Sequence, residues 1–218
     1  MRQNQRSVSA AIHHPIFARL WGVMSRHEPV EIRRHRDELL AGLTGRIIEV
    51  GAGTGSNFAH YPPDVEEVLA VEPEPYLRAL AEKAAARAPV RVEVVDGVAD
   101  ELPAEDGSFD AAVACLVLCS VPDQGRALAE LRRVLRPGGE LRFYEHIRSD
   151  RRAAALGQRA VDQIFWPRAF AGCHTHRDTP AAIAGAGFEI ERDRRMSVGP
   201  LPIANPVAAH AIGRARRA

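Results

Sequence analysis

The sequence is short of lysine, of cysteine and of long apolar runs. Lys83 is the only lysine among 218 residues, so arginine supplies nearly all of the 29 basic side chains. The 28 acidic side chains almost cancel them and leave a formal net charge of +1. Without a broad positive field there is no electrostatic basis for holding nucleic acid or an anionic membrane. We therefore expect no nucleic-acid partner.

The longest unbroken apolar stretch, 111–119, is far shorter than the roughly 20 residues that a membrane-spanning helix needs. Near the N-terminus, His13, His14 and Arg19 interrupt the apolar residues, so no signal-peptide core forms. The cysteines are Cys115, Cys119 and Cys173. An odd number of cysteines without a C-x-x-C pair favours a reduced protein. We expect no integral membrane segment and a cytoplasmic location, while the oligomeric state cannot be predicted.

Strand and helix patterns alternate from Arg46 to near the C-terminus. Short apolar or alternating runs predict strands at 46–50, 68–71, 90–95, 109–118, 140–147, 189–198 and 207–212. Helices are predicted to start at Pro73-Glu74-Pro75, after Asp123 (extending to Arg136) and at Thr179. This alternation is typical of a doubly wound α/β fold with a mainly parallel sheet.

Two segments stand outside this alternation, and they define the predicted domains. Residues 1–42 are expected to form a helical N-terminal cap, and residues 43–218 one α/β domain in which 151–178 is an insertion. The apolar residues of the two segments are Ile16, Phe17, Leu20, Trp21, Met24, Ile164, Phe165, Trp166 and Phe170. Each stripe has two interpretations: ordinary core packing, or a lid over the crevice beyond the carboxyl ends of the strands.

A glycine-rich turn, 51–55, follows the first predicted strand. Ser56 stands where the dinucleotide fingerprint requires glycine, and no lysine is near for a P-loop. Glu49, just before the glycines, would repel a pyrophosphate but suits a ligand with a cationic amino-acid end. Glu72 ends the second strand, where its carboxylate can accept hydrogen bonds from both hydroxyls of a ribose. The stretch 96–100 follows the third strand and can border an adenine ring.

This ordered set resembles the class I S-adenosylmethionine-dependent methyltransferases, in the small-molecule branch that includes ubiquinone and menaquinone methyltransferases. The stretches 102–110 and 135–139 are similar to that branch. A closer similarity, to the thiol methyltransferases of animal membranes and their bacterial relatives, is carried by 57–63, 116–121, Glu145-His146 and Gly172-Cys173. The resemblance spans about residues 45 to 213. It implies a Rossmann-like, seven-stranded, mainly parallel sheet with the last strand antiparallel, and S-adenosyl-L-methionine as the cofactor.

The resemblance also implies which residues contact the cofactor. They follow the first four strands and are Glu49, Gly51, Ala52, Gly53, Gly55, Glu72, Pro73, Gly97, Val98, Ala99 and Leu116. Val98 stands where many relatives have an aspartate that binds the adenine amino group, so this chain lacks that contact, and Asp100 is a candidate substitute.

The acceptor side is less strongly marked. His146 ends the fifth predicted strand and is the candidate catalytic residue, the alternative being a structural hydrogen bond. The predicted acceptor-binding residues are Trp21, His146, Phe165, Trp166, His174 and His176. The stretch 173–176 does not have a zinc-ligand spacing, so no metal is expected there. Cys115 and Cys119 are expected to be inert buried side chains.

These features predict a methyltransferase that acts on a small, rather apolar acceptor, for which the resemblance suggests a thiol. Two alternatives remain open. One is methylation of oxygen, nitrogen or carbon on a biosynthetic scaffold or a lipid head group. The other is a protein that binds S-adenosylmethionine without turnover. A nicotinamide oxidoreductase is disfavoured because Ser56 breaks the required glycine pattern.

Overall fold

The computed structural model of the chain describes residues 14–199 and 205–218. Within these residues a seven-stranded sheet has the order β3-β2-β1-β4-β5-β7-β6. The strands are β1 (Gly45–Val50), β2 (Val65–Val71), β3 (Arg91–Val95), β4 (Phe109–Cys115), β5 (Leu135–His146), β6 (Phe188–Ser197) and β7 (Ala209–Arg217). The α-helices are α2 (Pro15–Met24), α3 (Val30–Leu40), α4 (Pro75–Ala85), α5 (Gln124–Val134), α6 (Arg152–Ile164), α7 (Trp166–Ala169) and α8 (Thr179–Gly185). Short 3-10 turns, η1 (Ser25–His27) and η2 (Phe58–His60), complete the set.

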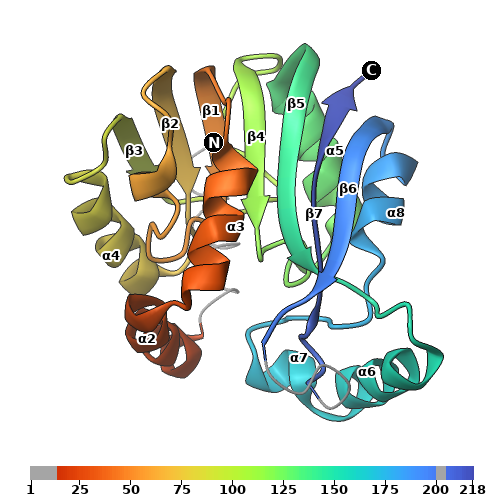
Figure 1. Cartoon of the computed structure of the whole chain (residues 1–218). Helices are drawn as coiled ribbons and strands as arrows, with labels where there is room; N and C mark the ends of the chain where they lie inside the picture. The colour runs from red at the N-terminus through yellow and green to blue at the C-terminus, as the bar shows by residue number, and fades with distance from the viewer. Residues whose placement is uncertain (1–13, 200–204) are drawn as a thin grey trace.

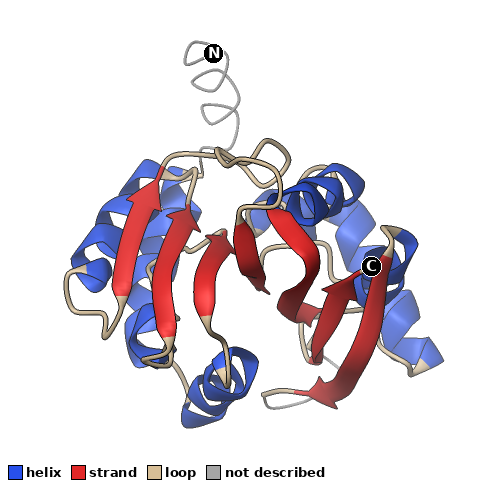
Figure 2. Ribbon diagram, turned by 90° about the horizontal axis from the view of Figure 1, so that it is seen from above, coloured by secondary structure: helices blue, strands red, loops and turns tan. Residues whose placement is uncertain are grey.

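The strand directions confirm the predicted sheet. β1 pairs in parallel with β2 and β4, and the parallel pairing continues to β3 on one side and β5 on the other. β7 is antiparallel to both of its neighbours, β5 and β6. Figures 1 and 2 show the resulting twisted sheet with helices on both faces.

Each face of the sheet carries its own layer of apolar side chains. Leu39 of α3 and Ala81 of α4 belong to one buried cluster, and Leu128 of α5 and Ile183 of α8 belong to the other. On β4, consecutive residues project to opposite faces and both faces are buried, which explains the uninterrupted apolar run in this part of the sequence.

Some predicted boundaries are wrong. β4 ends at Cys115 and not at Leu118, because Leu116 adopts a left-handed backbone conformation with φ of 59°. α5 ends at Val134, short of the predicted Arg136, because the chain enters β5 at Leu135. The last strand starts later and runs further than the predicted 207–212.

The two extra segments lie at one end of the sheet. Figure 1 shows α2, α6 and α7 beyond the arrowheads of β4 and β5, at the edge where the parallel strands end. In α2 the buried residues are Ala18 and Gly22. Ile16 and Met24 of the predicted apolar stripe are 85% and 55% exposed, so core packing does not explain that stripe. The part of the predicted cap at 1–13 lies outside the described residues.

No helix in the described part of the chain is both long enough and apolar enough to cross a membrane.

Candidate active site

A cavity of about 390 Å³ opens at the carboxyl ends of the parallel strands. This volume lies within the range of ligand pockets. Of the residues predicted to contact the cofactor, the cavity wall includes Glu49, Gly51, Ala52, Gly53, Glu72, Pro73, Gly97, Val98, Ala99 and Leu116. The structure thus brings together the ends of four strands, as the sequence predicts. Gly55 is the exception, since it lies against the ring of Phe58 and not on the cavity wall.

Glu49 is a buried acid at the end of β1. Its carboxylate accepts a 2.8 Å hydrogen bond from the Asn57 amide and a 2.7 Å hydrogen bond from the Tyr61 hydroxyl. Burial raises the pKa of Glu49 to about 7, although both hydrogen bonds oppose the shift. A carboxyl group with this pKa ionises readily when a cation is placed next to it.

Glu72 connects the end of β2 to the glycine-rich turn. Its two carboxylate oxygens accept hydrogen bonds from the backbone N–H groups of Gly53 (2.7 Å) and Glu74 (2.9 Å). Burial raises the pKa of Glu72 to about 7 as well. Gly53 itself has φ of 59°, a conformation that favours glycine, and a Cβ here would point toward the Trp21 indole, 3.6 Å away. Gly53 and Trp21 therefore border the same part of the cavity.

Arg36 is a site residue that the sequence analysis missed. It is 5% exposed and lines the cavity, and its guanidinium binds both Glu28 oxygens while donating to Asn57 at 2.6 Å and to the Cys115 sulfur at 3.2 Å. Burial raises the pKa of Cys115 to about 11, so that side chain is a neutral thiol. Arg36 and Glu49 therefore place a basic and an acidic group on the wall of the same cavity.

The end of the cavity near His146, where the sequence predicts the acceptor, contains part of the predicted set. The wall here includes Phe17, Trp21, His146, Trp166, Phe170 and Cys173. Phe165, His174 and His176 do not line the cavity. Phe165 is 45% exposed. His174 and His176 belong to a loop whose backbone N–H groups donate to the Cys119 carbonyl and to the Asp162 carboxylate, neither of which lines the cavity. Asp162 of α6 holds this loop by accepting hydrogen bonds from the backbone N–H groups of Thr175 and His176.

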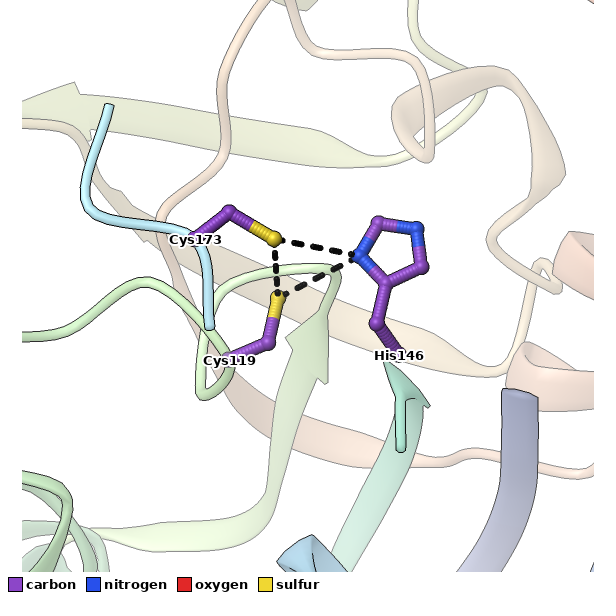
Figure 3. Close-up of side chains that lie close together, drawn as sticks. All are labelled: Cys119, His146 and Cys173. Atoms are coloured by element: carbon purple, nitrogen blue, oxygen red, sulfur yellow. Dashed lines mark hydrogen bonds between the residues drawn. The ribbon is translucent and has the colours of Figure 1, made fainter. Parts of the chain in front are cut away.

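Three side chains from distant parts of the chain meet at this end of the cavity. Figure 3 shows Cys119, His146 and Cys173 pointing toward one another. The His146 Nδ1 atom lies 3.5 Å from the Cys119 sulfur and 3.6 Å from the Cys173 sulfur, and the two sulfurs are 3.9 Å apart. The hydrogen bond between the two thiols lowers the pKa of Cys173 and raises that of Cys119. Cys119 is buried, as predicted, and its sulfur lies within reach of both the His146 ring and the Cys173 sulfur.

Glu145 is the residue that positions the loop after β4. It is fully buried, and its oxygens accept hydrogen bonds from the backbone N–H groups of Val117, Leu118 and Cys119 at 2.8 to 3.1 Å. Burial raises its pKa, and these hydrogen bonds oppose the shift. The loop that contains Cys119 thus takes its position from β5.

Comparisons with known proteins agree with this geometry. Residues 48–143 match a family model described as a methyltransferase domain. Human thiol S-methyltransferase TMT1B is 36% identical over 183 residues, which cover 81% of this chain and 73% of that protein. Human thiol S-methyltransferase TMT1A is 37% identical over 153 residues, covering 68% of this chain and 62% of the relative.

Solved structures support the fold. A geranyl diphosphate methyltransferase in complex with S-adenosylmethionine superposes with a TM-score of 0.66 at 14% identity, covering 86% of this chain and 85% of that one. A SAM-dependent methyltransferase of Thermotoga maritima gives a TM-score of 0.65 at 22% identity, covering 92% and 94%.

The chain's own residues fit S-adenosylmethionine. Two buried carboxyl groups, Glu49 and Glu72, face one cavity together with the Arg36 guanidinium and the backbone of the glycine-rich turn. Family, fold and site agree, and the chain belongs to the class I S-adenosylmethionine-dependent methyltransferases.

Proposed function

We propose that this enzyme transfers the methyl group of S-adenosylmethionine to the sulfur of a small, apolar thiol. The observation that carries the proposal is a single cavity that reaches from Glu49 and Glu72 at one end to His146 and Cys173 at the other. One chamber of this kind can hold a cofactor and an acceptor in contact. The names of the curated relatives, thiol S-methyltransferases at 36% and 37% identity, favour a thiol as that acceptor.

At the cofactor end, each polar residue would bind a different part of S-adenosylmethionine. Glu72 accepts hydrogen bonds from the ribose hydroxyls, and the backbone at Val98 and Ala99 borders the adenine. Glu49 and Arg36 face the amino and carboxylate groups of the methionine part. The bound cofactor supplies a methyl group that its sulfonium already activates. The protein's remaining task is to align an acceptor with that methyl, which can contribute several kcal/mol.

The acceptor end suits an apolar molecule that needs little help to lose a proton. Trp166 and Phe170 stack with their ring centres 4.0 Å apart and form part of its wall. The acidic residues on the described part of the cavity wall lie at or beyond the ends of the first three strands, away from His146. They are Glu49, Glu72 and Asp100. A thiol near its own pKa is partly ionised without a base, whereas a phenol, amine or carbon acid depends more on one.

We propose that the two extra segments cover the cavity. The proposed division is an N-terminal cap at 1–42, of which 14–42 are described, and a methyltransferase domain at 43–218. Its 151–178 insertion lies across the cavity from α2. Phe17 and Trp21 of α2 and Trp166 and Phe170 of the insertion all border the cavity, which supports a lid that keeps water away from the methyl group.

We also propose a reducing compartment, the cytoplasm, and no nucleic-acid partner. The described cysteines form no disulfide, and the sulfurs of Cys119 and Cys173 are 3.9 Å apart. Oxidation of this pair would alter the acceptor end of the cavity.

The experiment is an acceptor panel with S-adenosylmethionine labelled in its methyl group. Thiols, phenols, amines and quinols are incubated separately with the enzyme, and the products are identified by mass. The proposal expects label on the sulfur of apolar thiols. Label on oxygen, nitrogen or carbon with none on thiols would contradict thiol methylation. The enzyme would then be an O-, N- or C-methyltransferase. Cofactor binding without turnover of any acceptor would indicate a non-catalytic binding protein.

A further inference from the structure

Cys119, His146 and Cys173 come from three separate segments and place three metal-ligating atoms together. Cys119 lies in the loop after β4, His146 is the last residue of β5, and Cys173 follows α7. Their ligand atoms all lie within 4.8 Å of one another. This cluster is not apparent from the sequence, because the 173–176 stretch places Cys173 beside His174 and His176, and neither histidine belongs to the cluster or lines the cavity.

The separations match those of a tetrahedral zinc site. With Zn–S bonds of about 2.3 Å and Zn–N bonds of about 2.0 Å, tetrahedral angles place two sulfurs about 3.8 Å apart and a sulfur and a nitrogen about 3.5 Å apart. The observed values are 3.9 Å for the two sulfurs and 3.5 and 3.6 Å for each sulfur and His146 Nδ1. A pair of cysteines arranged only for a disulfide would not need an imidazole nitrogen at equal distance from both sulfurs.

The backbone around the three ligands is fixed by hydrogen bonds that do not use the ligand atoms. The Cys119 N–H donates to Glu145, and the Cys119 carbonyl accepts from the His174 N–H at 2.8 Å. The Arg177 guanidinium donates to the carbonyls of Leu118 and Val121, both at 2.8 Å. These contacts join the loop of Cys119 to the loop of Cys173.

Gly172 allows the same two loops to approach closely. It has φ of 81°, and a Cβ at this position would lie 2.7 Å from the Ser120 carbonyl oxygen. A side chain here would therefore push the loop of Cys173 away from the loop of Cys119. The three ligands are held in place before any ion arrives, which is what a high-affinity site requires.

We propose that Cys119, His146 and Cys173 bind a zinc-type divalent cation and leave its fourth position open to the cavity. His146 and Cys173 line the cavity while Cys119 is buried behind them, so the open side is the acceptor side. Soft thiolate and imidazole ligands select zinc over magnesium or calcium. Two thiolates and a neutral imidazole balance the double charge of the ion, and three protein ligands with one open position is the arrangement of catalytic zinc sites.

In this role the ion would hold the acceptor, and this step rests on the proposed function. The acceptor thiol binds the ion through sulfur and releases its proton to the solvent. The thiolate sulfur then forms a bond to the methyl carbon, and the electron pair of the broken carbon–sulfur bond stays on the sulfur of the cofactor product. The neutral thioether is a weaker ligand than the thiolate, which favours release of the product.

The test is cobalt binding to the full chain, kept reduced with a phosphine so that no added thiol competes for the ion. We expect one equivalent of Co²⁺ to produce sulfur-to-metal charge-transfer absorption and the visible bands of tetrahedral cobalt, and Zn²⁺ to abolish both. Cys119→Ser, Cys173→Ser and His146→Ala should each weaken binding by more than the roughly 10–100-fold loss caused by removing an outer-shell partner. Cys115→Ser is the matched control and should retain the wild-type spectrum, because Cys115 contacts Arg36 and not the cluster.

Circular dichroism and S-adenosylmethionine affinity show whether each variant is folded, and only folded variants are compared. Absence of the cobalt spectrum in the reduced wild-type chain overturns the site, as does a spectrum that survives in all three folded variants. Both outcomes leave thiol methylation standing, because they are measured without an acceptor. Addition of a thiol, but not of the matching alcohol, should shift the cobalt bands. An unshifted spectrum would overturn the acceptor-holding role.

Discussion

The buried carboxylate of Glu145, on β5, accepts a 3.1 Å hydrogen bond from the backbone N–H of Cys119, in the loop after β4. The same side chain accepts hydrogen bonds from Val117 and Leu118. One acidic side chain thus determines the shape of the loop that separates the cofactor end of the cavity from its acceptor end.

Glu145→Gln should destabilise the fold by roughly 1–3 kcal/mol, because an amide has one acceptor oxygen in place of two and leaves a buried N–H without its partner. Urea denaturation measures the loss. Glu66→Gln, at an exposed position of β2, is the control. Equal losses in the two variants would show that Glu145 has no special role in the loop.

S-adenosylmethionine affinity should rise with pH between about pH 6 and 7.5. Burial raises the pKa values of Glu49 and Glu72 to about 7, so both carboxyl groups are partly protonated in that interval. A cationic ligand favours their ionised forms, so binding releases protons and becomes tighter as the pH rises. Calorimetry at one pH in buffers of different ionisation enthalpy measures the protons released. Proton uptake on binding would contradict the predicted sign.

Glu72→Ala should weaken cofactor binding by roughly 1.5–3 kcal/mol, the contribution of a hydrogen bond to a charged group. The variant also removes the acceptor for the Gly53 N–H, which loosens the turn. Glu67→Ala is the control on the same strand, since Glu67 pairs with Arg46 outside the cavity. Calorimetry should show little change for Glu67→Ala. Unchanged affinity in Glu72→Ala would mean that the ribose is held elsewhere.

Trp166→Ala should lower kcat/KM for the acceptor by about 10–100-fold while cofactor affinity changes little, because loss of one wall of the acceptor end spoils alignment. Phe165→Ala is its sequence neighbour and control. Phe165 is 45% exposed and does not line the cavity, so its removal should leave the acceptor kinetics near those of the wild type. Steady-state kinetics with the acceptor concentration varied will compare kcat/KM of the two variants. An equal loss of kcat/KM in both would place the acceptor away from Trp166.

The cofactor end could be predicted from the sequence because its signals are local. Glu49 and Glu72 each follow an apolar run directly, and parallel strands bring their carboxyl ends to one edge. The predicted end of β4 is wrong, because an apolar run does not reveal that Leu116 takes a left-handed conformation. Arg36 was missed because it lies in a charged helix whose sequence resembles an exposed surface.

The acceptor end could not be predicted in the same way. Cys119, His146 and Cys173 are far apart in sequence, and no spacing rule connects them. Their meeting depends on the pairing of β4 with β5 and on the fold of the insertion. Phe165 and Trp166 are adjacent aromatic residues, and nothing in the sequence distinguishes them. The structure places Trp166 on the cavity wall and leaves Phe165 exposed to solvent.

The most direct test of thiol methylation compares one apolar thiol with the alcohol of the same carbon skeleton. The two acceptors fill the same space and differ only in the acceptor atom. With methyl-labelled S-adenosylmethionine, the mass of the product and kcat/KM are measured for each acceptor at the same pH. The proposed function predicts a methylated thiol and no methylated alcohol. Equal or faster methylation of the alcohol would contradict it.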